Sequence, residues 1–277
     1  MRDSSNPTLA RIQLGRFLRQ YRERAGIKPG DPRVSKIAKA TKLKAIEAGR
    51  IQSYRYSDIL AFGSVYGISR EELNNLTALQ EASEKPGWYH QFDVPEAFAT
   101  FLTMESVASR IAIVEIELIT GLFQIPEYTR ELFEYSPETK GAADKGVKTE
   151  RQERVLGGAH PPEIVYITSE AALKRQVGGP EVMRAQLDHL VAMAERSNVE
   201  ILVLPFDLGP HHSMFGPYEI LYFDAGEFPT TVYLESVDGS RYEETRRFIE
   251  LYEGVFDRTR KQGITIKEYA NDERSVA

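Results

Sequence analysis

Residues 26–49 read GIKPGDPRVSKIAKATKLKAIEAG, a segment with a glycine at each end and a lysine or arginine at every second or third position of its middle. The residues that face one side at helical spacing are Val34, Ile37, Ala38, Thr41 and Ala45. One continuous helix over residues 33–48 fits this spacing better than two helices joined by a tight turn. Gly26 and Gly49 suit left-handed helix caps, so we expect the preceding helix to end at Gly26 and this one at Gly49.

Helical patterns flank this segment on both sides. Before it, apolar residues follow one helical stripe, and they are Ala10, Leu14, Phe17, Leu18, Tyr21 and Ala25. After it, a third helical pattern is formed by Ile59, Leu60, Phe62 and Tyr66. Ser69 and Glu72 form a capping box, which opens a fourth helix. The sequence therefore predicts an all-helical domain of four or five short helices over residues 1–83.

Charge is divided unevenly along the chain. Residues 1–70 carry 15 Lys or Arg against 5 Asp or Glu, whereas residues 71–277 carry 20 against 36. A basic region of this kind is typical of a polyanion-binding module, because local cations determine affinity for a phosphate backbone even when the net charge is negative. Nucleic acid is the first polyanion to consider.

A cationic cluster occupies and follows the central segment. The candidate DNA contacts are Arg33, Lys36, Lys39, Thr41, Lys42, Lys44, Arg50 and Arg55. The cations would contact phosphates, and Thr41 and Lys42 are the expected base readers. A charge run is otherwise usually a solvated helix face. Such a face normally carries interspersed Glu, however, and no acid occurs between Arg33 and Ala45, which favours DNA or RNA binding.

The composition argues against several other classes of protein. The chain has no cysteine, so it has no disulfide, thiolate metal site or thiol nucleophile, which fits a reducing cytoplasm. The longest apolar stretch, residues 111–123, contains Glu115, Glu117 and Gly121 and is too short to span a bilayer. The first residues lack the apolar run of a signal peptide. We therefore expect a cytoplasmic protein with no membrane partner.

Residues 84–277 mix helical and strand patterns. A connector at residues 84–87 precedes Trp88, which we interpret as a packing anchor between the two domains. Strands are expected at residues 111–118, 164–167, 199–204, 219–223 and 230–235, and helices at residues 95–110, 127–133, 180–196 and 243–260. Residues 138–147 are polar and suit a mobile loop or a poorly packed helix start. The second domain is therefore predicted to be α+β, with a mixed or antiparallel sheet.

Several polar residues of this domain lie on elements that otherwise look core-facing, as expected for the lining of a small-molecule site. The candidate ligand contacts are Glu105, Arg110, Gln124, Tyr128 and Arg154, with His211 and His212 at a rim. Buried salt bridges and strand-end hydrogen bonds are the alternative for each. No metal, cofactor or catalytic residue is expected, because adjacent histidines splay apart and no nucleophile motif occurs. An enzyme is not favoured, although catalytic groups from distant segments would escape this interpretation.

Ordered landmarks over nearly the whole chain carry a family resemblance. In the first domain they are Leu14, Arg16, Leu18 and Arg22 before residues 25–27, and then residues 46–50. In the second they include residues 87–89, 121–124, 170–173, 177–180 and 204–206. The chain resembles actinobacterial helix-turn-helix regulators of the xenobiotic-response-element type, which are fused to a C-terminal domain of generally unassigned function. The resemblance implies a lambda-repressor-like fold at the amino end and DNA as the partner.

The first domain departs from this family where Pro32 and Arg33 replace a Leu and an Ala, and where Lys36 replaces a core Leu. One hypothesis is a homodimeric DNA-binding transcriptional regulator whose second domain senses a small molecule or a protein partner. The alternative is a degenerate helix-turn-helix whose second domain is a small-molecule binder or a biosynthetic enzyme. A third hypothesis is an adaptor for an antisigma-like or small acidic protein.

Overall fold

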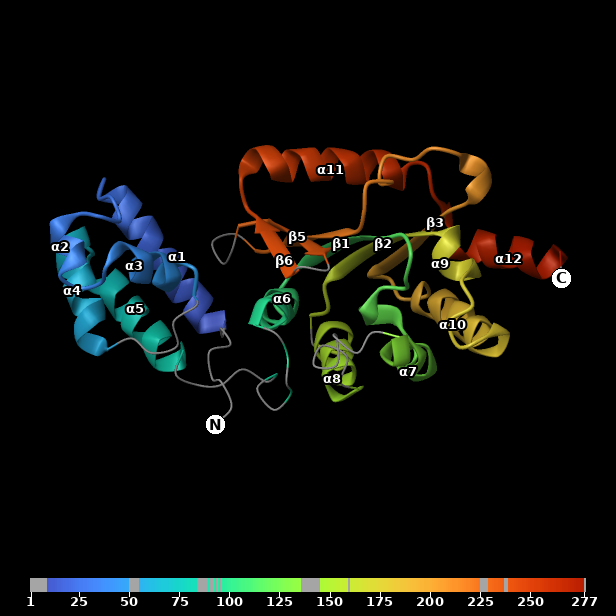
Figure 1. The fold of residues 1–277 in the computed structure, drawn as a ribbon, viewed down its shortest axis with the longest axis horizontal. Coiled ribbons are helices and arrows are strands. Elements are labelled where there is room, and N and C mark those ends of the chain that lie inside the picture. The colour runs from blue at the N-terminus through green and yellow to red at the C-terminus, as the bar shows by residue number, and fades with distance from the viewer. Residues whose placement is uncertain are drawn as a thin grey trace. The chain divides into compact units, whose positions relative to one another are not determined.

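The computed structural model describes residues 9–49, 55–83, 89, 92, 94, 96–135, 145–158, 160–224, 229–236 and 239–276. The chain divides into two compact units, residues 1–103 and 104–277, which we call the head and the body (Figure 1). The division falls inside helix α6 (Glu96–Glu105), C-terminal to the connector that the sequence suggests as a boundary. Trp88 and His90 lie outside the described residues.

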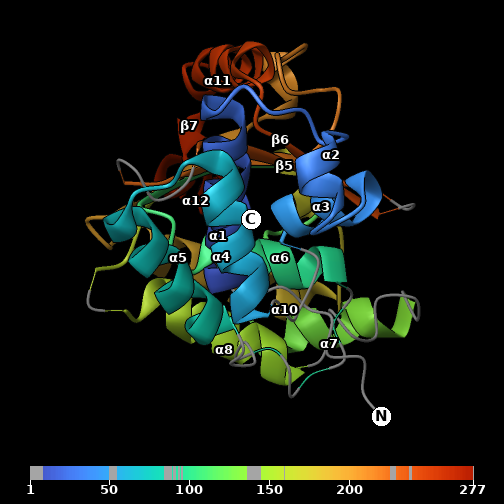
Figure 2. The same ribbon diagram turned by 90° about the vertical axis from the view of Figure 1, so that its left-hand side faces the viewer.

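Five helices are described in the N-terminal part of the head (Figure 2). They are α1 (Leu9–Arg24), α2 (Pro32–Ser35), α3 (Ala40–Glu47), α4 (Tyr56–Tyr66) and α5 (Arg70–Ser83). Gly26 and Gly49 adopt left-handed backbone with φ of 66° and 69°, as expected for glycines that end helices. The capping box is confirmed: the Glu72 amide donates to the Ser69 hydroxyl at 3.2 Å, and the Ser69 amide donates to the Glu72 carboxylate at 2.9 Å.

The prediction of one continuous helix over residues 33–48 is wrong, because the segment folds as two helices separated by a turn. Asp31 caps α2 by accepting a hydrogen bond from the Arg33 amide at 2.9 Å, and Pro32 takes the first helical position. Lys39 then adopts extended backbone, with φ −60° and ψ 152°, immediately before α3 begins. This arrangement is a helix-turn-helix.

The spacing of the buried residues in this segment differs from the spacing that a single helix over residues 33–48 would give. Val34 and Ala38 are buried before the turn, and the next buried residue, Leu43, comes five positions after Ala38. A helix repeats every 3.6 residues, so this step requires a break. Thr41, which one long helix would bury, is exposed, and so is Lys36 in the turn.

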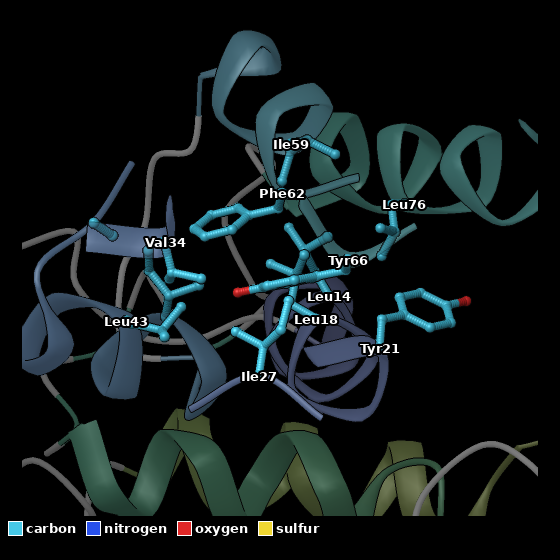
Figure 3. Packing of buried hydrophobic residues seen from close by; sticks show 12 residues of the cluster. Leu14, Leu18, Tyr21, Ile27, Val34, Leu43, Ile59, Phe62, Tyr66 and Leu76 are labelled. Carbon is cyan, nitrogen blue, oxygen red and sulfur yellow. The ribbon is translucent and has the colours of Figure 1, made fainter. Parts of the chain in front are cut away.

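An apolar cluster holds the five helices together (Figure 3). Its buried members are Leu14, Leu18, Tyr21, Ile27, Val34, Ala38, Leu43, Ile46, Ile59, Phe62, Tyr66 and Leu76. An eight-residue helix such as α3 is unstable by itself in water. Burial of a Leu or Ile side chain contributes about 1.5–3 kcal/mol, so Leu43 and Ile46 are what fix α3 on the head.

The body contains a mixed seven-stranded sheet in the order β6-β5-β4-β1-β2-β3-β7. The strands are β1 (Arg110–Glu115), β2 (Glu163–Ser169), β3 (Val199–Leu204), β4 (Tyr218–Tyr222), β5 (Thr231–Ser236), β6 (Gly239–Glu243) and β7 (Ile264–Thr265). β1, β2 and β3 are parallel, whereas β4, β5 and β6 form an antiparallel extension on β1 and β7 pairs antiparallel with β3. The predicted α+β class with a mixed sheet is confirmed.

Helices cover both faces of this sheet (Figure 1). α11 (Arg246–Arg260) covers the first face, where its Phe256 packs with Ala112, Val114 and Ile220. The second face carries α7 (Pro126–Tyr135), α8 (Lys145–Leu156) and α10 (Pro180–Met193), with the short helices η2 (Gly121–Phe123) and α9 (Glu170–Lys174). Because side chains alternate along a strand, odd-numbered residues of β1 point to the second face.

Most predicted elements of the body are present with shifted ends. The helix expected to reach residue 110 ends at Glu105, and the strand expected to reach residue 118 ends at Glu115. The sequence missed β6, β7, η2, α9, η4 (Phe206–Leu208) and α12 (Ile266–Val276). Of the expected loop at residues 138–147, residues 138–144 lie outside the described residues and the rest begins α8. No helix in the described ranges is long and apolar enough to cross a lipid bilayer.

Candidate functional site

The outward side of α3 is the first candidate site. Leu43 and Ile46 are buried and form the side of this helix that faces the core of the head. At 100° per residue, the centre of the opposite side is formed by small residues, namely Thr41, Ala45 and Ala48. Lys42 and Lys44 lie at the two edges of this strip, and both are exposed. The helix can therefore enter a groove with its small residues while its two lysines reach the phosphates on either side.

Four members of the predicted cationic cluster lie in the turn before α3 or on α3 itself. The exposed members are Lys36 and Lys39 in the turn, Lys42 and Lys44 on α3, and Arg55 at the start of α4. None of these five makes an ion pair with another described residue. Arg33 differs, because its guanidinium pairs with the Asp31 carboxylate at 2.9 Å. Arg50 lies outside the described residues.

The amino end of α3 is also open to an anion. Lys39 provides no side-chain cap, and the first turn contains no acid. The first amides of a helix have no partner within it and carry the positive end of its dipole. Together with Lys39 and Lys42, these amides suit a phosphate of the DNA backbone.

A buried ion pair connects α3 to α1. Arg22 donates through Nε and Nη2 to the two carboxylate oxygens of Glu47 at 2.5 and 2.9 Å, and through Nη1 to the Ile27 carbonyl at 2.9 Å. Both side chains are only 7% exposed. Gly15 on α1 allows the close approach, because an added Cβ would lie 3.0 Å from the Glu47 carbonyl oxygen and still nearer to that of Ile46. Sequence reasoning missed this brace, since its two ends are far apart in the chain.

In the body, the structure brings together three of the predicted ligand contacts, Glu105, Gln124 and Tyr128, all of them buried. Glu105 accepts two hydrogen bonds from Arg151 of α8, at 2.6 and 2.7 Å. Gly121 allows this placement, because an added Cβ would lie 2.6 Å from Arg151 Nη1.

Gln124 and Tyr128 support the segment that leads from β1 into α7. Gln124 donates to the Ile119 carbonyl at 2.7 Å and accepts from Lys148 Nζ at 2.5 Å. The Tyr128 hydroxyl accepts from the Ile119 amide at 3.2 Å. These bonds are the buried-hydrogen-bond alternative that the sequence left open, and they place Lys148 beside Arg151 on the second face of the sheet.

The other predicted ligand contacts lie elsewhere. Arg110 lies on the first face, with its guanidinium 5.0 Å from the Tyr222 ring centroid and 3.6 Å from the Glu163 carboxylate. Arg154 is exposed and pairs with Glu150 at 2.6 Å. His211 and His212 lie in the connection before β4, where the pKa of His211 is lowered by burial and then by its neighbour. The described residues contain no group of three His, Cys, Asp or Glu side chains arranged to hold a metal ion.

Sequence reasoning missed a group of carboxyls on the second face. Glu115 ends β1, Glu219 is the second residue of β4, and Glu235 lies near the end of β5. Burial raises the pKa of Glu115 to about 7 and that of Glu219 to about 8. Burial also lowers the pKa of Lys148 to about 8. An alternating strand does not reveal which face is covered, so the pattern gave no signal for this group.

Comparisons with known protein families agree with both parts of this architecture. A sequence model of a helix-turn-helix domain matches residues 13–76. A second one, described as a domain of unknown function, DUF5753, matches residues 98–268. No curated protein and no solved structure shows significant similarity to the chain. The helix-turn-helix domain indicates a DNA-binding regulator, and because the second match spans more than half of the sequence, the chain belongs to the DUF5753 family, with a helix-turn-helix domain in front of it.

Proposed function

We propose that this protein is a cytoplasmic transcriptional regulator of the xenobiotic-response-element type, of actinobacterial origin, and that it places α3 in the major groove of DNA. The observation that carries the proposal is a group of exposed lysines in the turn and on α3 that form no ion pair with another described residue, namely Lys36, Lys39, Lys42 and Lys44. Thr41, in the centre of the outward strip, is the proposed base reader, with Lys42 beside it. Arg55, and to a lesser degree the Asp31-paired Arg33, would add phosphate contacts.

The proposal is tested by gel retardation of the DNA upstream of the protein's own gene. Lys42→Glu combined with Lys44→Glu should abolish the complex, because both edges of the outward strip would repel phosphates. Wild-type affinity should fall steeply between about 50 and 200 mM salt, since each phosphate contact releases a counterion. Lys174→Glu with Lys261→Glu in the body makes the same change in net charge and should bind as wild type does. Undiminished binding by the α3 double variant would reject the assignment.

We further propose that the body senses an effector and that the chain acts as a homodimer. Paired heads would read half-sites about 34 Å apart, one turn of DNA. The partly covered carboxyls Glu115 and Glu219 on the second face of the sheet support a small-molecule effector rather than a protein one, because a small molecule can reach polar groups that lie below the surface. Whatever binds must favour one arrangement of the heads over another to regulate DNA binding.

The second candidate is a biosynthetic or small-molecule-binding body on a head that no longer binds DNA. It is motivated by Pro32, Arg33 and Lys36, which depart from the family pattern, although the segment that contains them folds as a helix-turn-helix. It keeps one supporting observation, the titratable carboxyls Glu115 and Glu219, whose pKa values of about 7 and 8 suit proton transfer. Turnover by the full chain together with no DNA affinity in the retardation assay would favour this candidate.

A further inference from the structure

Four hydrogen-bond acceptors lie on the second face of the sheet, and we call Glu115, Thr168, Glu219 and Glu235 the acceptor cluster. Glu115 is in register with Thr168 of β2, so both point to the same face. Glu219 is in register with Ile113 of β1 and Tyr233 of β5, which places it on that face too. Glu235 is two residues beyond Tyr233 and therefore shares its direction.

The acceptor cluster reaches from the surface into the core. Glu235 is exposed, Glu115 and Glu219 are partly covered, and Thr168 is 0% exposed. Glu219 Oε2 and Thr168 Oγ1 are both buried, and no described residue donates a hydrogen bond to either atom, although the Thr168 hydroxyl lies beside that of Tyr166. Buried acceptors normally have donors, so these two atoms lack a donor that the described residues do not supply.

The nearby cations direct their known hydrogen bonds elsewhere. Arg151 uses Nε and Nη2 on Glu105, at 2.6 and 2.7 Å. Lys148 donates to Gln124 at 2.5 Å. Arg151 acts on both Glu219 and Glu235, and Lys148 acts on Glu235. With Glu105 included, four carboxyls share these two cations, so the surroundings hold more potential negative charge than positive charge.

Burial, and to a lesser degree the neighbouring negative charges, raise the pKa values of two carboxyls of the acceptor cluster. Burial raises the pKa of Glu219 to about 8, and the negative charge of Glu105 adds to the effect. Burial likewise raises the pKa of Glu115 to about 7. A proton thus takes the place of a missing positive charge. The described carboxyls are not grouped as ligands of a metal ion, so a cation with donors on separate atoms fits them better.

We propose that the acceptor cluster binds an organic cation with N–H donors, an ammonium or guanidinium group, through Glu219 and Thr168 at the buried end and Glu235 at the open end. The proposal names the chemical class of the effector. Its regulatory consequence rests on the proposed sensing function, whereas binding of the cation does not depend on DNA.

The test is calorimetric titration of the full chain with methylguanidinium, agmatine and benzylammonium chlorides at constant ionic strength. At least one of them should bind with one-to-one stoichiometry. Tetramethylammonium, a cation without N–H groups, should not bind. Glu219→Gln should weaken binding by about tenfold or more, because it removes the charge and half of the acceptor capacity. Glu235→Gln, at an exposed position that does not endanger folding, should also weaken it.

Glu117→Gln is the matched control, since Glu117 lies two residues from Glu115 but is 59% exposed and paired with Arg175. It should bind as the wild type does. Affinity should also rise between about pH 6 and about pH 8, because the proton on Glu219 competes with the cation. Three outcomes would overturn the proposal: none of the three cations binds, binding survives both Glu219→Gln and Glu235→Gln, or acetate or phosphate binds instead through Lys148.

The two proposals fail separately. Loss of DNA retardation in wild-type protein, with cation binding intact, rejects the regulator and keeps the site. Normal DNA retardation with no cation bound rejects the effector class and keeps the regulator. A circular dichroism spectrum of Glu219→Gln that matches wild type excludes unfolding as the cause of lost binding.

Discussion

At the scale of single residues, Glu47 has a structural task rather than a DNA-binding one. Glu47 is the acidic residue of α3, and its side chain is buried. Both of its carboxylate oxygens accept hydrogen bonds from Arg22. Glu47→Ala leaves the Arg22 guanidinium buried without its carboxylate, so we expect unfolding to become easier by about 3 kcal/mol. Urea unfolding followed by circular dichroism measures this loss.

The matched variants separate the pair from general charge effects. Arg22→Met with Glu47→Leu replaces the pair by apolar side chains and should recover most of the lost stability. Glu250→Ala in the body removes an exposed acid that pairs with Arg246 at 2.6 Å and should cost less than about 1 kcal/mol. If the double variant is as unstable as Glu47→Ala alone, the buried pair is not the source of the effect.

Glu219 makes stability depend on pH in a defined direction. Its pKa rises from 4.5 in an unfolded chain to about 8 in the fold, because burial disfavours the charged form. The folded state therefore holds the proton more tightly, and this contribution is complete below about pH 4.5 and is lost as the pH rises through about 8. Glu219→Gln cannot ionise, so its melting temperature should exceed that of wild type increasingly toward pH 8. A difference that stays constant across this range would contradict the assignment.

At the scale of elements, the close contact between α1 and α3 at Gly15 determines the position of α3 in the head. Alanine normally stabilises a helix by about 1 kcal/mol over glycine. Gly15→Ala should instead destabilise the head by about 1–3 kcal/mol, because the new Cβ would press on backbone carbonyls of α3. Gly254→Ala in α11 meets only the flexible end of Arg258, at 3.3 Å, and should stabilise the protein. Thermal unfolding of both variants checks the opposite signs.

The elements also show how far the sequence could lead. Apolar periodicity predicted α1, α4, α10 and the strands β2 to β5, because each buries one regular stripe or run. It could not detect the turn between Ala38 and Leu43, because the apolar residues of the two short helices are spaced almost as they would be along one face of a single helix. The edge strand β7 has only two residues and is defined by its pairing with β3, so its sequence contains no alternation that could predict it. The cations of the candidate site could be predicted from the sequence. The ion pair between Arg22 and Glu47 and the acceptor cluster could not, because they depend on contacts between segments that are far apart in the chain.

At the scale of the whole molecule, the core of the head points to a separable DNA-binding part. Every buried member of its apolar cluster lies between Leu14 and Leu76, so the proposed domain of residues 1–83 contains that cluster entirely. Residues 1–83 expressed alone should therefore melt cooperatively with a helical circular dichroism spectrum. The fragment should sediment as a monomer and the 31.4 kDa full chain as a dimer, if the body of residues 84–277 supplies the interface.

The fragment should also bind DNA more weakly than the full chain, because two linked heads gain from a high effective concentration at the second half-site. Retardation of the same DNA by both proteins measures the difference, with the Lys42→Glu and Lys44→Glu fragment as the control that should not bind. An unfolded fragment would place the boundary later, nearer to α6. A folded fragment with the affinity of the full chain would mean that the body adds nothing to DNA binding and that dimerisation through it must be abandoned.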